Sequence, residues 1–220
     1  IDYYIEQLLD CSKYLNDVLY IVADGYYAKK KMFSAVLSMN KHLITKLRPD
    51  ANMKYLFDRT KNPNAHGNKK YAGKVDWKNL DLNKWIDLGE HPKFDHLYIY
   101  TQELYSVQFK RNLKVVIMIN TRNGKYVLLA STNLFQNALE IIQYYSLRFQ
   151  IEFLFRDAKQ FTGLTHCQAR SEEKLDFHFN MSLAAINLYQ TQMKLNGLNN
   201  TSMNCFIRKA YNTKLVNLLF

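Results

Sequence analysis

Periodic and continuous hydrophobic patterns in the first part of the chain predict a helix, a strand, a second helix and a second strand. Apolar positions in residues 3–16 recur about every 3.6 residues, which is typical of a helix. The continuous apolar run from Val18 to Asp24 predicts a strand buried on both faces. A helix at residues 26–40 and a strand at His42–Arg48, closed by Pro49, complete the series. This order predicts a βαβ unit and therefore an α/β fold.

The pattern changes after Pro49. Residues 50–112 are polar and rich in turn signals, and strands are predicted at Phe94–Leu104 and Tyr105–Arg111. The segment "TRNG" (residues 121–124) lies between two apolar runs, and Asn-Gly in that position predicts a hairpin. We therefore expect a β-rich insertion at 50–113 that returns to the main sheet at 114–130.

Helical periodicity dominates the remainder of the chain. Thr132 or Asn133 is the predicted N-cap of a helix that extends to about Lys159, with a candidate break near Glu140. A further helix is expected at 171–195. The pattern of the Asn-rich and then apolar tail predicts no definite structure. The expected domains are residues 1–49 and 114–195 for the core, 50–113 for the insertion and 196–220 for the tail.

Charge adds a candidate partner to this outline. The chain has 220 residues, of which 48% are hydrophobic, so a substantial core can form. It carries 30 Lys and Arg against 19 Asp and Glu, a formal charge of +11. Such an excess attracts polyanions, and nucleic acid is the obvious candidate. The alternative at this point is a basic protein without that function.

Three cysteines and the absence of a long apolar run bear on the compartment. Cys11, Cys167 and Cys205 are far apart, have no zinc-ligand spacing and cannot all pair within one chain, which favours a reducing environment. No apolar run reaches membrane-spanning length, so a cytoplasmic protein without a membrane partner is expected. The first residue is Ile1 rather than Met, which suggests a fragment of a longer protein.

Four polar residues in the segment "YYSLRFQIEFLFRDAKQ" fall on one side of a continuous helix. At about 100° per residue, Tyr145, Arg148, Glu152 and Lys159 share one narrow stripe. An ion pair between Arg148 and Glu152, four residues apart, explains part of this pattern. A carboxylate that holds a metal ion, flanked by groups that hold phosphates, explains all four residues.

A hard divalent cation needs more than one carboxylate, so a second acid must come from another element. Asp24 is the first candidate because it ends a predicted strand, and ligands of open α/β sheets gather at the carboxyl ends of strands. The alternative is that Asp24 caps the helix that follows.

These residues resemble a known family. The pattern Tyr145-x-x-Arg148-x-x-x-Glu152-x-x-x-x-x-x-Lys159 is similar to the Tyr-Arg-Glu-Lys signature of bacterial insertion-sequence DDE transposases. The segments "IVADGYYAK", "HLITKLRPDANMKY", "YVLLASTNL" and "FRDAKQFTGLTHCQAR" also resemble that family, and the similarity covers nearly all of residues 15–195.

The resemblance implies a ribonuclease H-like core with an insertion domain, in which three carboxylates bind two Mg²⁺, with Mn²⁺ as a substitute. The reaction would be DNA cleavage and strand transfer at transposon ends by two-metal catalysis. Asp24 would be the second carboxylate and Glu152 the third, while Tyr145, Arg148 and Lys159 would contact phosphates. The partners would be transposon-end and target DNA, in a homodimeric synaptic complex near the bacterial nucleoid.

One departure from the family concerns the first carboxylate, which lies on the first strand of the family's core. The acids before Asp24 are Asp2, Asp10 and Asp17 (with Glu6), and none ends a predicted strand. We therefore expect the C-terminal part of a catalytic domain, incomplete at its N-terminus, exposing the edge of strand 18–23 and inactive in isolation. The alternatives are a non-catalytic DNA-binding remnant and an unrelated basic domain.

Several further residues are weaker candidates. Arg48 and Arg170 are possible phosphate ligands, each weighed against a solvated surface arginine. The run Lys29–Lys31 is weighed in the same way. Trp77 and Trp85 are more typical of the core of a small β-domain than of a wedge between DNA bases.

Overall fold

The computed structural model describes residues 1–60, 68–197 and 202–219. The chain forms two compact units, Ile1–Arg148 and Phe149–Phe220, and each is described by itself.

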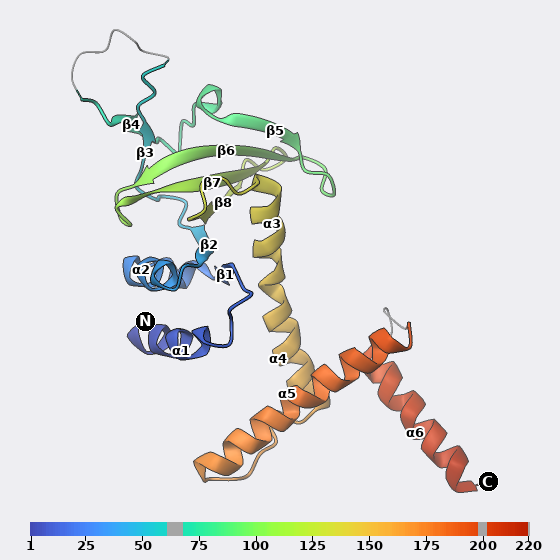
Figure 1. The fold of residues 1–220 in the computed structure, drawn as a ribbon. Coiled ribbons are helices and arrows are strands. Elements are labelled where there is room, and N and C mark those ends of the chain that lie inside the picture. The colour runs from blue at the N-terminus through green and yellow to red at the C-terminus, as the bar shows by residue number, and fades with distance from the viewer. Residues whose placement is uncertain (61–67, 198–201, 220) are drawn as a thin grey trace. The chain divides into compact units, whose positions relative to one another are not determined.

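The first unit is built on one eight-stranded sheet with the strand order β1-β2-β8-β7-β6-β3-β4, to which β5 is added beside β6 (Figure 1). Its strands are β1 (Tyr20–Ala23), β2 (His42–Leu47), β3 (Met53–Leu56), β4 (Tyr71–Lys74), β5 (Ile86–Glu90), β6 (Leu97–Ser106), β7 (Arg111–Asn120) and β8 (Tyr126–Ser131). Its helices are α1 (Asp2–Ser12), the 3-10 helices η1 (Gly25–Tyr27) and η2 (Leu82–Lys84), α2 (Lys30–Ser38) and α3 (Ala138–Leu147).

The predicted βαβ unit is confirmed. β1 runs parallel to β2, with Tyr20 opposite His42 and Ala23 opposite Thr45, while the other paired strands are antiparallel. The strand predicted to be buried on both faces is β1, whose residues pack against core clusters on both sides of the sheet but are only half-buried. Core residues cover both of its faces, but β1 ends the strand order and has one open edge.

The strands of the predicted β-rich stretch join the same sheet. β3, β4, β5 and β6 all lie in it, and β6 pairs with β7 along its whole length. The hairpin at residues 121–124 is confirmed between β7 and β8, with Gly124 at a φ of 65°. The separate strand predicted at Tyr105–Arg111 is wrong. A turn at 107–110 interrupts it because the Phe109 ring is buried there, stacked on Phe33 at 4.1 Å.

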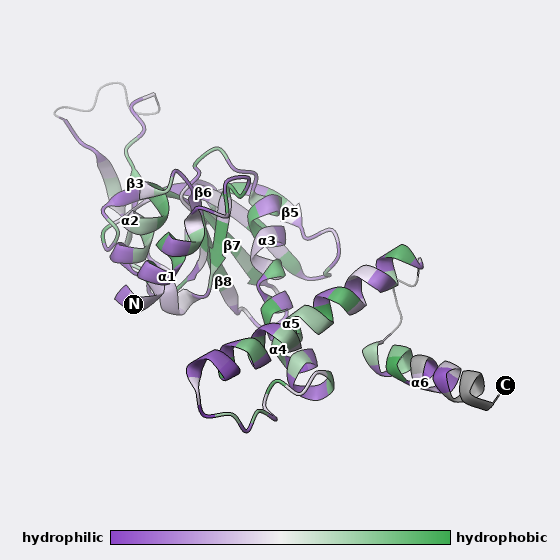
Figure 2. Cartoon of the chain, turned by 60° about the horizontal axis from the view of Figure 1, so that its bottom comes forward, coloured by the Kyte–Doolittle hydropathy of each residue, from purple (hydrophilic) through white to green (hydrophobic). Residues whose placement is uncertain are grey.

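The core of the first unit occupies both faces of the sheet. One cluster contains Phe33 and Val36 of α2 together with Leu43, Leu113 and Val115. The opposite cluster joins Ile141 of α3 to inward residues of β2, β6, β7 and β8, namely Ile44, Ile99, Val116 and Leu129. The hydropathy colouring of Figure 2 shows the apolar character of β7. Helix α2 therefore covers one face of the sheet, and α3 covers the other.

The two tryptophans belong to the core, as expected. Trp85 is buried, and its indole N–H donates to the Tyr55 hydroxyl at 3.2 Å. The Trp77 indole N–H donates to the Ala51 carbonyl at 2.6 Å, and its ring packs against the same cluster.

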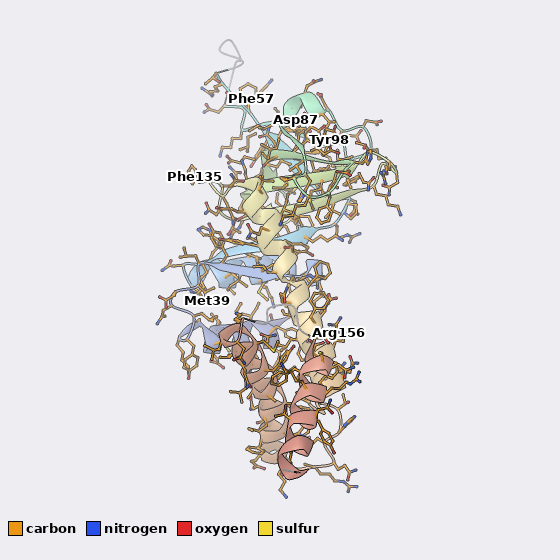
Figure 3. All side chains as sticks on the ribbon, turned by 90° about the vertical axis from the view of Figure 1, so that its right-hand side faces the viewer. Met39, Phe57, Asp87, Tyr98, Phe135 and Arg156 are labelled. Carbon is orange, nitrogen blue, oxygen red and sulfur yellow. The ribbon has the colours of Figure 1, made fainter. Side chains whose placement is uncertain are left out.

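The predicted helix from 132 to 159 differs from the structure at its start. The N-cap is Asn137, whose side chain accepts from the Leu139 N–H. Thr132 Oγ1 instead accepts from the Leu43 N–H at 3.0 Å. Asn133 Oδ1 accepts from the Phe135 N–H at 3.1 Å, but this bond closes a turn and no helix follows directly. The intervening loop leaves Phe135 98% exposed (Figure 3).

The break in this predicted helix falls at Arg148 and not near Glu140. α3 ends at Leu147, and the next helix begins at Phe149. The Arg148 N–H donates to the Tyr145 carbonyl, three residues back, at 3.2 Å, so the regular four-residue spacing of α-helical bonds changes there. The prediction that the four polar side chains share one stripe depended on a continuous helix. Tyr145 and Arg148 instead belong to the first unit, and Glu152 and Lys159 to the second.

The second unit consists of α4 (Phe149–Phe161), α5 (Glu172–Leu195) and α6 (Met203–Leu219) in the described part of the chain. Its core contains Ala158, Leu164, Ile186 and Met203. The helix expected at 171–195 is confirmed as α5. The tail, for which no structure was predicted, contains α6.

Candidate active site

Asp24 follows β1 directly and is held by its own backbone neighbours. Its Oδ1 accepts a hydrogen bond from the Tyr26 N–H at 3.1 Å, which makes Asp24 the N-cap of η1. Its carbonyl accepts from the Tyr27 N–H at 2.9 Å and from Thr45 Oγ1 at 3.2 Å. The capping alternative is therefore real, although the helix it caps is η1; the N-cap of α2 is Lys29. None of these bonds uses the second carboxylate oxygen, Oδ2.

The turn after Asp24 is close to β2. A Cβ atom at Gly25 would lie 3.1 Å from the Lys46 carbonyl oxygen, tighter than almost all such contacts. Glycine therefore lets the turn lie against β2 at this point. Thr45, which is fully buried, anchors the same turn through the Asp24 carbonyl. The sequence analysis did not identify Thr45, because its position opposite Ala23 depends on the register of β1 and β2, which local pattern does not give.

Arg148 reaches Asp24 from the end of α3. Its Nη1 lies 3.7 Å from Asp24 Oδ2, and the side chains are 20% and 48% exposed, respectively. This separation is longer than the 2.7–2.9 Å of a charge-assisted hydrogen bond, so the charges attract without a tight bond. The Tyr145 ring lies next to the guanidinium, whose carbon is 5.9 Å from the ring centroid. The structure thus brings together Asp24, Tyr145 and Arg148.

Packing of α3 explains this proximity. Tyr144 contacts Tyr20 of β1, with ring centroids 5.3 Å apart, and Ile141 is fully buried in the cluster beneath α3. These contacts fix the end of the helix over β1, which carries Asp24.

Tyr145 is protonated at neutral pH in this setting. Burial is the main cause that raises the pKa of its phenol above the ordinary value, and the Asp24 charge adds to it. The Arg148 guanidinium acts in the opposite direction, lowering the pKa through its charge and a hydrogen bond. A neutral phenol can donate a hydrogen bond to an anion beside Arg148.

Glu152 and Lys159 belong to α4 in the second unit, and both are exposed. Glu152 lies in the first turn of the helix and Lys159 in the last, where the helix dipole favours an acid and a base, respectively. Seven residues apart, they fall on one side of α4.

The weaker candidates lie on the surface. Arg48 Nε is 3.0 Å from Asp50 Oδ1, and both side chains are largely exposed. Arg170 is exposed in the segment before α5. Lys31 pairs with Asp2 at 2.8 Å, whereas Lys29 is exposed at the start of α2.

The carboxylate of Asp24 is a suitable ligand for a hard cation such as Mg²⁺. Mg²⁺ in enzymes commonly binds one or two carboxylates and completes its coordination with water and phosphate oxygens. Asp24 provides a half-exposed carboxylate with one oxygen outside the turn's hydrogen bonds. Within residues 1–60, 68–197 and 202–219, no three acids, histidines or cysteines lie close enough to form a complete site of their own.

The fold and the cluster agree with one class of protein. A mixed α/β unit with a mostly antiparallel sheet is compatible with a ribonuclease H-like domain of the DDE type. The family model for the transposase DDE domain matches residues 4–188, and the chain therefore belongs to that family. No curated protein matches the chain. In the described part of the chain, no helix has both the length and the apolar character needed to cross a bilayer.

Proposed function

We propose that the chain is part of a bacterial insertion-sequence transposase that cleaves DNA and transfers strands at the element's ends with the help of Mg²⁺ or Mn²⁺. The observation that carries this proposal is the cluster of Asp24, Arg148 and Tyr145 at the carboxyl end of β1, in a chain of the transposase DDE domain family. The proposed partners are the transposon ends and the target DNA, which two copies would hold in a synaptic complex near the nucleoid.

Asp24 and Glu152 would hold the metal as the second and third carboxylates of the family's set. When bound, the metal activates the attacking nucleophile and stabilises the negative charge on the leaving oxygen. Asp24 contributes Oδ2, while its Oδ1 stays on the Tyr26 N–H and keeps the side chain oriented. Asp24 comes from the first unit and Glu152 from the second, so the proposal requires both carboxylates to bind the same ion.

Arg148, Tyr145 and Lys159 would hold the DNA. The planar guanidinium of Arg148 has the geometry to bind two phosphate oxygens at once. The neutral Tyr145 phenol beside it donates one further hydrogen bond. Lys159 adds an exposed positive charge on the same side of α4 as Glu152.

A second candidate function is DNA binding without cleavage. It is favoured by the absence, among the described residues, of three clustered metal-ligand side chains. Of the family's three carboxylates we assign two in this chain. If the third ligand is required for cleavage, the chain would bind transposon ends and occupy them.

A cleavage assay separates the two candidates. The full chain is incubated with labelled DNA carrying the element's ends, with Mg²⁺ or Mn²⁺, beside the variants Asp24→Asn and Glu152→Gln. The matched control is Glu173→Gln, an exposed acid in the first turn of α5. The proposed enzyme loses cleavage in both site variants and retains it in the control. DNA binding without cleavage supports the second candidate, and no binding to DNA overturns both.

A further inference from the structure

Four tyrosines form a row of touching rings beside Asp24, two from α1 and two from η1. The ring centroids of Tyr3 and Tyr4 are 5.7 Å apart, those of Tyr4 and Tyr27 are 5.4 Å apart, and those of Tyr27 and Tyr26 are 5.2 Å apart. All three contacts are edge-to-face, the arrangement that aromatic rings favour. We name this set, Tyr3, Tyr4, Tyr26 and Tyr27, the tyrosine row.

The row has an anchored centre and exposed ends. Tyr27 is half-buried and packs against the hydrophobic core beneath α2, and burial is the main cause that raises its pKa, to which Asp24 adds. Tyr26 is 61% exposed and Tyr3 is 65% exposed. Covering the core accounts for Tyr27 but not for these two outer rings. Single exposed aromatic residues are common, whereas here two exposed rings, Tyr3 and Tyr26, are held by ring contacts to their neighbours and offer separate faces on which a base can stack.

The tyrosine row is continuous with the candidate active site. The backbone N–H of Tyr26 donates to Asp24 Oδ1 at 3.1 Å, so Tyr26 belongs to the turn that carries the carboxylate. The charge of Asp24 also acts on the phenol of Tyr27 and adds to its raised pKa. DNA bound on the row would therefore lie next to the turn proposed to hold the metal.

Positive charge surrounds the row. Lys29 and Lys30 follow it directly and are exposed, and Lys46 is exposed on the strand that Gly25 touches. Of the acids nearby, Asp2 pairs with Lys31 at 2.8 Å, Asp24 faces Arg148 at 3.7 Å, and Glu6 is exposed on α1. Lys29, Lys30 and Lys46 outnumber Glu6, so the remaining charge is positive, which suits a polyanion.

We propose that the tyrosine row stacks unpaired DNA bases next to the cleavage site, while Lys29, Lys30 and Lys46 contact the adjoining phosphates. Exposed rings combined with lysines are what single-stranded nucleic acid requires, because every base has a face that can stack. An acidic peptide would use the lysines but would gain little from flat exposed rings. Trp77 and Trp85 cannot take this role, since both rings pack in or against the core and both indole N–H groups have hydrogen-bond partners there. The inference rests on the proposed function.

The test compares two DNA molecules: a blunt duplex and the same duplex extended by a few unpaired nucleotides that include a fluorescent adenine analogue. The full chain is titrated with each, without added divalent metal. Variants are Tyr26→Leu, which removes the ring, and Tyr26→Phe, which keeps it. Tyr14→Leu is the matched control, because Tyr14 is 79% exposed beside Lys13 but lies beyond the other end of α1 from Tyr3.

The expected result is tighter binding of the extended DNA, by about tenfold, with quenching of the analogue by stacking. Tyr26→Leu removes most of that preference and the quenching, while Tyr26→Phe and Tyr14→Leu keep both. Equal binding of the two DNA molecules without quenching overturns the stacking role and leaves the proposed function standing. Failure of the chain to bind either DNA overturns the proposed function and the stacking role together. Unchanged circular dichroism of Tyr26→Leu shows that the loss is not one of folding.

Discussion

Arg148 Nη1 lies 3.7 Å from Asp24 Oδ2, although one residue ends α3 and the other follows β1. Such a separation compensates the charge of a half-exposed carboxylate without a tight bond. A cation bound at Asp24, as proposed, would therefore interact with the same carboxylate as Arg148.

Asp24→Asn is expected to weaken Mn²⁺ binding by about tenfold, since the amide removes the negative charge from the ligand. Isothermal titration of the chain with Mn²⁺ measures the change. The matched control is Asp81→Asn, because Asp81 also caps a short 3-10 helix and also has a basic neighbour, Lys84 at 3.2 Å. Equal effects of the two substitutions would falsify the assignment of Asp24 to a metal.

Arg148→Gln is expected to weaken DNA binding and to make it less sensitive to salt. Each phosphate contact releases counterions, so its loss lowers the slope of log affinity against log salt concentration by about 1. Arg122→Gln, at the exposed turn between β7 and β8, is the control and is expected to leave the slope unchanged. Fluorescence anisotropy over a series of salt concentrations gives both slopes. A slope unchanged by Arg148→Gln would remove this residue from the phosphate contacts.

Alkaline pH is expected to destabilise the first unit. Burial raises the pKa of Tyr145 in the folded state above that of the unfolded chain, and the same holds for Tyr100 and Tyr126. The folded state then binds more protons, so the stabilisation is complete below the unfolded pKa of about 10 and is lost as pH rises through the folded pKa. Tyr145→Phe removes one of these groups and is expected to reduce the alkaline decline. Urea unfolding over a pH series measures it, and an identical decline in the variant contradicts the prediction.

Lys41→Met is expected to lower the free energy of unfolding by about 1.5–3 kcal/mol. The Lys41 ammonium is buried and donates to the Leu15 carbonyl at 2.5 Å and the Val18 carbonyl at 2.6 Å. Methionine replaces the unbranched stem of the lysine side chain but lacks the ammonium, so it leaves both carbonyls without this donor. Lys46→Met, at an exposed position of β2, is the control and is expected to change stability by less than about 0.5 kcal/mol. Equal midpoints of urea unfolding for the two variants would show that the buried contacts contribute little.

Local pattern was enough to predict much of the first unit. The apolar run before Asp24 and the next strand predicted a parallel pair, because both signals lie within short segments and the connection is a helix. The Asn-Gly turn likewise predicted the β7–β8 hairpin. The position of Asp24 at the end of a strand followed from the same local signal.

Other features depend on contacts between distant segments, and local pattern could not supply them. Thr132 and Asn133 have the chemistry of an N-cap, but Thr132 Oγ1 accepts from the Leu43 N–H of a distant strand, and the bond that Asn133 Oδ1 accepts closes only a turn. The break at Arg148 likewise divides a run with uninterrupted helical periodicity. The four residues predicted to share one side of a helix are therefore divided between two units. The proximity of Arg148 to Asp24 depends on how α3 packs over β1, which no sequence spacing encodes.

The last prediction concerns Asp24 and Glu152, the two acids that the proposed mechanism joins at one metal ion. Mn²⁺ affinity is measured for the parent chain, for Asp24→Asn, for Glu152→Gln and for the double variant. Distant and independent sites give additive free-energy changes, whereas ligands of one ion are coupled by about 0.5–3 kcal/mol. We expect coupling, because an ion that has lost one carboxylate gains less from the other. Glu173→Gln in place of Glu152→Gln completes a control cycle, which is expected to be additive. If the Asp24 and Glu152 cycle is additive as well, the two carboxylates do not hold the same ion.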